Sequence, residues 1–209
     1  MRRMLVALGC AMFAGAPIGA RAQGSGDHTA LGLLAGSSWT TLHGADIPGP
    51  THAWGLALGA FARWGFGARF AFQPELQFIQ KGDNQVDIAG TTTFTEAIHL
   101  SYVEVPLLLR VHADPMRGVT PYLVAGPAVA IKSGCSVDVR GLAGNWSCAN
   151  LPAAESLDYG AIAGGGVEFA LGGRTYSLSA RYDWGAKDAF KQNDAKNRAL
   201  SLLLGIRLR

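Results

Sequence analysis

Seven charged residues recur at positions where a β-strand would place their side chains on one face. Two of them, Glu75 and Glu104, are carboxylates, and a pair of carboxylates is the arrangement that general acid–base catalysis uses. Arginines occupy the same face, and an ion pair explains a carboxylate beside an arginine without any reaction. We therefore predict a structural network of buried ion pairs and no catalytic residue. Its members are Arg69, Glu75, Glu104, Arg110, Glu168, Arg181 and Asp183.

A second set of residues carries the groups of a hydrolase. His99, Ser101 and Asp188 would lie near one end of the predicted strands. The chain has no Gly-x-Ser-x-Gly turn that would raise a serine nucleophile above a sheet, and no oxyanion-hole motif. The sequence therefore gives little support to a surface hydrolase.

Metal and cofactor signals are equally weak. His43 and His52 flank Asp46, but the two histidines are nine positions apart and lack metal-ligand spacing. The glycine run 164–166 is not followed by the Lys-Ser/Thr pair of a phosphate-binding loop. We expect no metal and no cofactor.

The elements that must position these residues are strands. From Ala68 to Lys81 polar and apolar residues alternate, and from Ile98 to Val111 they alternate again. Eight such segments follow one another, each roughly twice as long as the 5 to 6 residues usual in soluble domains and long enough for the 9 to 11 residues of a tilted membrane strand. They predict an all-β protein, an eight-stranded antiparallel up-and-down transmembrane barrel. The segments are 29–41, 53–64, 68–81, 98–111, 120–132, 157–171, 175–186 and 197–209.

The connections between these segments alternate in length. Four are long and three are short, so the long ones would gather at one end of a barrel. Outer-membrane barrels have short periplasmic turns and longer extracellular loops. We expect the same arrangement, with polar side chains filling an interior that leaves no continuous water channel for ion or proton flux. The long connections are 42–52, 82–97, 133–156 and 187–196; the short ones are 65–67, 112–119 and 172–174.

Aromatic residues near the strand ends predict two interfacial girdles. Tryptophan and tyrosine prefer the boundary between lipid and water at both faces of a membrane. Three of these residues adjoin long loops and three adjoin short turns. The predicted girdle comprises Trp39, Trp54, Trp64, Tyr122, Tyr176 and Trp184.

The N-terminus has the features of a secretory signal peptide. Arg2 and Arg3 precede an apolar run, and a small-residue ending leads to predicted cleavage before Gln23. This divides the chain into a signal peptide at 1–22 and a barrel domain at 23–209. The signal removes three of the 18 Lys and Arg residues, which leaves 15 against 15 Asp and Glu. A neutral mature chain gives no basis for nucleic-acid binding.

Two cysteines remain in the exported chain. Cys135 and Cys148 lie thirteen positions apart, and an even pair in an exported protein predicts a disulfide. Closing a loop of this size would contribute about 3 kcal/mol in the chain-entropy model.

Several segments of the mature chain form an ordered set: Phe72 to Leu76 with Lys81-Gly82, Tyr102 to Arg110, Pro121 to Pro127, and Arg181-Tyr182. Together they resemble the PorT-like outer-membrane β-barrel family, which has an outer membrane protein β-barrel domain. The resemblance spans the mature chain. It implies an eight-stranded barrel in the outer membrane of a Gram-negative bacterium, in a family whose members mostly lack an assigned activity.

These observations lead to a functional expectation. We expect a monomeric, non-enzymatic barrel in outer-membrane lipid, a structural scaffold whose extracellular loops bind a protein or other surface ligand, with the third loop as the main contact. A membrane-embedded enzyme or lipid-handling barrel stays open, and would need titratable groups with perturbed pKa values at the outer rim. A soluble lipocalin-like binder of an apolar ligand also stays open, and would need apolar residues facing inward.

Overall fold

A computed structural model describes residues 29–43, 52–89, 92–140, 145–147, 156–190 and 193–208. The predicted signal peptide lies outside these residues, so it stays a prediction. The described residues contain no helix that is long and apolar enough to span a membrane.

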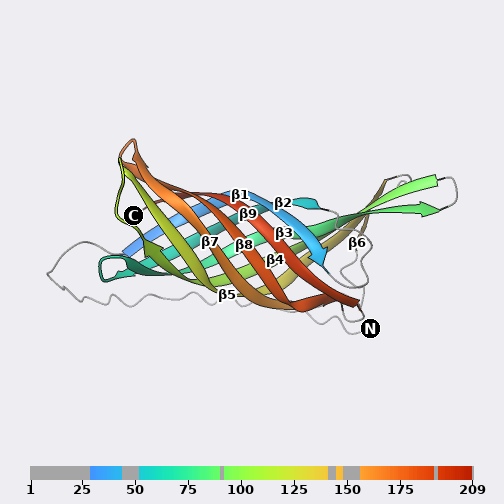
Figure 1. Cartoon of the computed structure of the whole chain (residues 1–209). Helices are drawn as coiled ribbons and strands as arrows, with labels where there is room; N and C mark the ends of the chain where they lie inside the picture. The colour runs from blue at the N-terminus through green and yellow to red at the C-terminus, as the bar shows by residue number, and fades with distance from the viewer. Residues whose placement is uncertain are drawn as a thin grey trace, which may run out of the picture.

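Eight long antiparallel strands close into a barrel, which confirms the predicted fold class (Figure 1). Each long strand pairs with its neighbours in the chain, and β1 pairs with β9 to complete the ring. A short strand, β6, adds to the outer part of β5. The strands are β1 (Thr29–His43), β2 (Ala53–Phe66), β3 (Phe70–Ala89), β4 (Thr92–His112), β5 (Val119–Arg140), β6 (Asn145–Ser147), β7 (Leu157–Leu171), β8 (Arg174–Phe190) and β9 (Asn193–Arg207).

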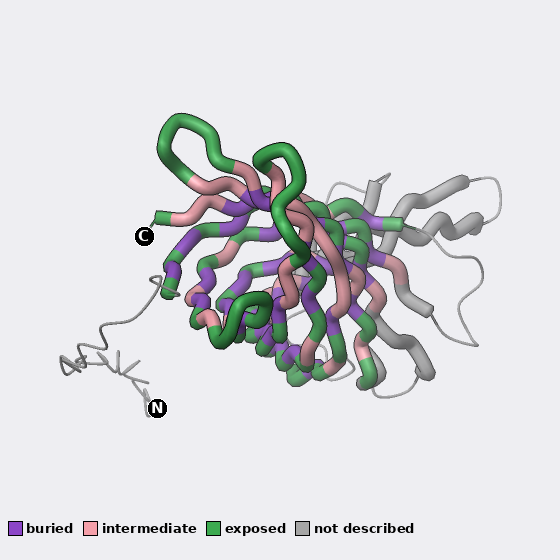
Figure 2. The backbone as a smooth tube through the Cα atoms, turned by 60° about the vertical axis from the view of Figure 1, so that its left-hand side comes forward, coloured by how far each residue is buried: buried purple, intermediate pink, exposed green. Residues whose placement is uncertain are grey.

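Burial alternates residue by residue along the strands, as Figure 2 shows. On β4, for example, Glu104 and Arg110 are buried, whereas Val105 and Leu109 are 41% and 45% exposed. Small and polar side chains face inward because the interior of an eight-stranded barrel is narrow. Large apolar side chains cover the outside, which is the reverse of what a lipocalin-like binder of an apolar ligand would need.

The short connections all lie at one end of the barrel. The turns Gly67–Arg69 and Gly172–Gly173 use glycines at positive φ, a conformation that costs glycine little. Both chain ends of the barrel lie at this same end, where the Leu208 N–H donates a hydrogen bond of 2.8 Å to the Leu31 carbonyl. We call this end the turn end and the opposite one the loop end.

The strands at the loop end are longer than the sequence predicted. The segment 82–97 is wrong as a loop: it belongs to the β3–β4 hairpin, which is paired as far as Ala89 and Thr92. β5 continues to Arg140. β8 extends to Phe190 and β9 begins at Asn193, so most of the predicted loop 187–196 belongs to these two strands. Such strands carry polar residues on both faces, so a search for alternating apolar residues does not detect them. Backbone hydrogen bonds across a hairpin form without an apolar face.

Three strands therefore leave the barrel together. β3 pairs with β2 only as far as Ile79, but with β4 as far as Ala89. β4 in turn pairs with the outer part of β5, which carries β6. We name this extension the projecting sheet: β3 from 82 to 89, β4 from 92 to 99, β5 from 135 to 140, and β6. Eight strand residues span about 25 Å, and Figure 1 shows the hairpin reaching well past the barrel.

Candidate functional site

The barrel interior holds six of the seven residues of the predicted ionic network. They are Glu75, Glu104, Arg110, Glu168, Arg181 and Asp183, all buried. Arg69 was wrongly assigned to the interior. It lies in a turn just before β3 begins, its side chain is 58% exposed, and it forms a 2.8 Å ion pair with Asp114 on the next turn. The alternation that placed it inward continues in sequence, but the barrel wall ends at Phe70.

Glu75 anchors the middle of the interior. Its Oε2 atom accepts from Arg181 Nη1 at 2.6 Å, and its Oε1 atom accepts from Gln73 Nε2 at 2.6 Å. Gln77 donates to the same carboxylate. With three donors and a side chain that is fully buried, this charge is compensated as a buried ion must be.

Towards the loop end, a lysine joins two carboxylates. Lys81 Nζ lies 2.9 Å from Glu104 Oε2 and also binds Asp183. Its ammonium lies 5.6 Å from the centre of the Tyr102 ring. Lys81 was not among the predicted network residues, although it shares the strand face of Glu75 and that parity could have identified it.

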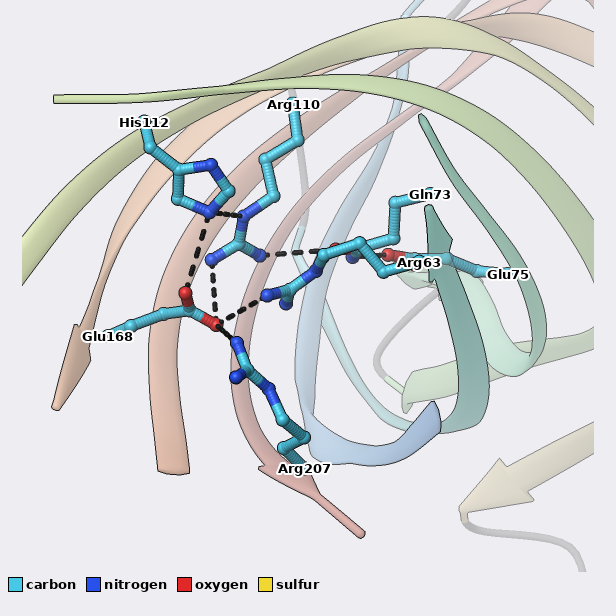
Figure 3. A network of polar contacts seen from close by, with 7 residues as sticks. All are labelled: Arg63, Gln73, Glu75, Arg110, His112, Glu168 and Arg207. Atoms are coloured by element: carbon cyan, nitrogen blue, oxygen red, sulfur yellow. Dashed lines mark hydrogen bonds and ion pairs between the residues drawn. The ribbon is translucent and has the colours of Figure 1, made fainter. Parts of the chain in front are cut away.

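Towards the turn end, three arginines surround one carboxylate (Figure 3). Glu168 Oε1 lies 2.9 Å from Arg63 Nη1, 3.0 Å from Arg110 Nη2 and 3.7 Å from Arg207 Nη2. The Arg63 Nε atom also donates to Gln73 Oε1 at 2.9 Å, which links this group to the Glu75 cluster. The sequence prediction missed Arg63 and Arg207, because each lies near the end of its strand.

Tyr122 is not part of an aromatic girdle, which corrects its predicted place. The side chain is only 3% exposed and lies inside the barrel, where the Arg110 guanidinium carbon is 3.3 Å from the ring centre. Gly166 makes room for it, because a Cβ atom there would fall 2.7 Å from the phenol ring. Tyr122 shares its parity with the buried Val124 and Ala128, so alternation was a better guide than nearness to a strand end.

The other five aromatic residues have different degrees of exposure. The four tryptophans are between 42% and 60% exposed and point outward, and Trp39 packs against Trp54 with ring centres 4.0 Å apart. Tyr176 is half-buried and stacks on Phe169 at 5.9 Å. The tryptophans are Trp39, Trp54, Trp64 and Trp184.

The two carboxylates considered for acid–base chemistry are held apart by different cations. Glu75 binds Arg181 and Glu104 binds Lys81. No group of three potential metal ligands occurs among the residues that the structure describes. The contacts of Glu75 and Glu104 are therefore those of compensated buried ion pairs.

Several predicted residues lie outside the described part of the chain. Cys148 and Asp46 are among them, and the side chains of Cys135, His99 and Asp188 are likewise outside it. The disulfide therefore stays a prediction.

A comparison with protein families identifies the group to which this fold belongs. Residues 30–191 match the outer membrane protein beta-barrel domain. The chain belongs to that family. Membership places this outer membrane beta-barrel in the outer membrane, where its exposed apolar face meets lipid.

The solved structure of Neisserial surface protein A agrees with the beta-barrel family assignment at the level of the fold. Neisserial surface protein A has a TM-score of 0.52 and 13% identity, over 86% of this chain and 99% of that protein. Ail of Yersinia pestis, solved with the heparin analogue sucrose octasulfate, has a TM-score of 0.47 and 13% identity, over 87% of this chain and all of that protein (100%). No curated protein sequence matches the chain.

Proposed function

We propose that this outer-membrane barrel is a closed, non-enzymatic scaffold whose projecting sheet binds a partner at the cell surface. The single observation that carries the proposal is the length of β3, which pairs with β4 for about ten residues beyond the end of its pairing with β2. Outer-membrane barrels carry their longer segments on the extracellular side. The projecting sheet would then stand outside the cell.

The contacts in the barrel interior favour a scaffold function and argue against a channel function. Ion pairs recur from Lys81 near the loop end to Glu168 near the turn end, and the residues between them are buried. An eight-stranded barrel is just wide enough for its side chains to fill it. We infer that no ion path runs through it.

The same contacts support a non-enzymatic function. A general base must reach a substrate proton, yet Glu75 is fully buried and bonded to Arg181, Gln73 and Gln77.

We also propose a closer relationship to PorT-like proteins, which rests on the segments 72–76, 102–110 and 121–127. A role in protein secretion is not part of this proposal.

The binding role can be tested with a photo-crosslinking amino acid placed at Thr93, which lies near the tip of the projecting hairpin opposite Ile88. Intact cells would be illuminated in the presence of a labelled second population of cells. We expect labelled adducts from position 93. The matched control is Ala113, an exposed residue in a turn at the opposite end, which should give none. If position 93 crosslinks only to the barrel itself, the binding proposal is wrong.

The scaffold role can be tested in planar lipid bilayers. We expect the purified barrel to give no steady current at any ionic strength. A steady current that changes selectivity in Arg110→Gln would show a conducting interior and contradict the proposal.

A further inference from the structure

The charges inside the barrel are unevenly distributed along its axis. At the turn end, Arg63, Arg110 and Arg207 surround the single carboxylate of Glu168. At the loop end, by contrast, the one ammonium of Lys81 lies between two carboxylates. The turn end therefore has two more positive charges than its ion pairs neutralise.

The neighbouring His112 contacts both sides of this cluster. Its Nε2 atom accepts a hydrogen bond of 2.9 Å from Arg110 Nε and lies 3.5 Å from Glu168 Oε2. Arg69 and Asp114 neutralise each other at the rim.

One guanidinium nitrogen of this cluster has unused hydrogen-bonding capacity. Arg207 Nε is a buried atom that makes no hydrogen bond to any described residue, whereas Arg110 Nη2 lies 3.0 Å from Glu168 Oε1 in an ion pair. An unsatisfied buried donor is costly, and more so when it carries charge. A ligand that accepts several hydrogen bonds and carries negative charge would relieve both costs.

A pocket gives such a ligand access to the cluster. It has a volume of about 310 Å³, lies at the turn end, and is lined by Arg63, Arg207 and His112 with Thr120 and the Arg69–Asp114 pair at its rim. Arg63 is only 4% exposed and lies at the base of the pocket. Its guanidinium is held in place there by hydrogen bonds to Glu168 and Gln73. The side chain of Arg207 is 37% exposed, so it can turn towards a ligand.

We propose that this turn-end pocket binds a phosphate-type oxyanion. Planar guanidinium groups match the oxygen spacing of phosphate and can bind it through two parallel hydrogen bonds. Arg63 is the fixed donor and Arg207 is the movable one, while Arg110 adds positive charge from behind. The Glu168 and Asp114 carboxylates oppose an anion, but the arginines outnumber them. The phosphate would come either from solution or from the headgroup of a phospholipid in the adjacent leaflet.

The test uses the full-length mature barrel in an uncharged maltoside detergent. Inorganic phosphate and a short-chain phosphatidic acid are each titrated by calorimetry against wild type, Arg207→Gln and Arg207→Lys. The matched control is Arg174→Gln, an exposed arginine at the same end that does not line the pocket. Heat-modifiable migration on gels checks that each variant is folded.

We expect saturable binding that Arg207→Gln weakens at least about tenfold, the loss of one charge-assisted hydrogen-bonded contact. Arg207→Lys should keep part of the affinity, and Arg174→Gln should keep all of it. Equal affinity for both probes identifies phosphate from solution, and tighter binding of the phosphatidic acid identifies a lipid headgroup. No saturable binding of either probe overturns the proposal, as does an equal loss of affinity in Arg207→Gln and Arg174→Gln.

Discussion

The buried ion pairs of this barrel join distant parts of the chain. Glu75 and Arg181 are 106 positions apart in sequence and 2.6 Å apart in the folded barrel. Breaking a buried ion pair leaves an uncompensated charge, whereas replacing both partners by apolar residues is often tolerated. A buried ion pair is therefore costly to break on one side, although it adds little stability over an apolar pair.

Removal of one partner should reveal this dependence. We predict that Arg181→Ala lowers the free energy of unfolding by about 3 to 5 kcal/mol, because Glu75 stays buried with its charge unpaired. The measurement is urea unfolding in lipid vesicles, followed by tryptophan fluorescence. The control is the double variant Glu75→Leu with Arg181→Leu, which should recover most of the loss. A double variant as unstable as the sum of both single variants would refute the explanation.

Tyr122 tests a different contact, the stacking of its ring on Arg110. A cation on an aromatic face is worth about 2 kcal/mol where water is excluded. We predict a loss of that size in Tyr122→Leu and almost none in Tyr122→Phe, which keeps the ring. The same unfolding experiment measures both variants. Equal losses in the two would mean that the hydroxyl, and not the ring, matters.

At the scale of elements, the barrel wall and the projecting sheet are separable. Lys81 pairs with Leu100 at the point where the hairpin leaves the barrel, and β2 provides no partner for β3 beyond it. The strand pairs that form the barrel wall lie between this point and the turn end. We therefore expect a change in the length of the sheet to leave the register of the strands inside the membrane unchanged.

Shortening the hairpin should leave the barrel intact. We predict that replacing residues 82–99 by Asn-Gly, which makes a two-residue turn between Lys81 and Leu100, changes the free energy of unfolding by less than about 1 kcal/mol, since loop length has a weak effect on stability. Heat-modifiable migration and urea unfolding measure this. A barrel that no longer folds would show that the projecting sheet is part of the folding unit.

At the scale of the whole molecule, the outer surface is an apolar band that faces lipid. Val105 and Val111 both point outward on β4, but Val105 lies near the middle of the strand and Val111 lies beside a turn. Arginine on the lipid face of a barrel is costly at the membrane midplane and cheap near the interface. The two positions form a matched pair on one strand.

This pair gives a prediction for the depth of the barrel in the membrane. Val105→Arg should lower the free energy of unfolding in vesicles by about 2 to 4 kcal/mol, and Val111→Arg by about 0 to 1 kcal/mol. Equal costs at the two sites would show that the band is not centred on the membrane. In detergent micelles, which have no fixed thickness, the difference should shrink.

The sequence by itself determined the fold class and the face of most strand residues, because side chains in a strand alternate with a period of two. That local rule correctly placed Glu75, Glu104 and Arg181 inside. It also pointed to Tyr122 being inside, although the position near a strand end had suggested a girdle residue. Alternation does not show where the barrel wall ends. For this reason the prediction placed Arg69 inside the barrel, although it lies in a turn outside the wall.

Only the tertiary structure decided which charges meet. The partners of Glu168 come from β2, β4 and β9, and their distances depend on how far each strand is staggered along the closed barrel. Likewise, the length of the projecting sheet depends on backbone pairing between β3, β4 and β5, which polar sequences can form without an apolar pattern. Stagger and pairing are properties of the closed ring, so no single strand contains them.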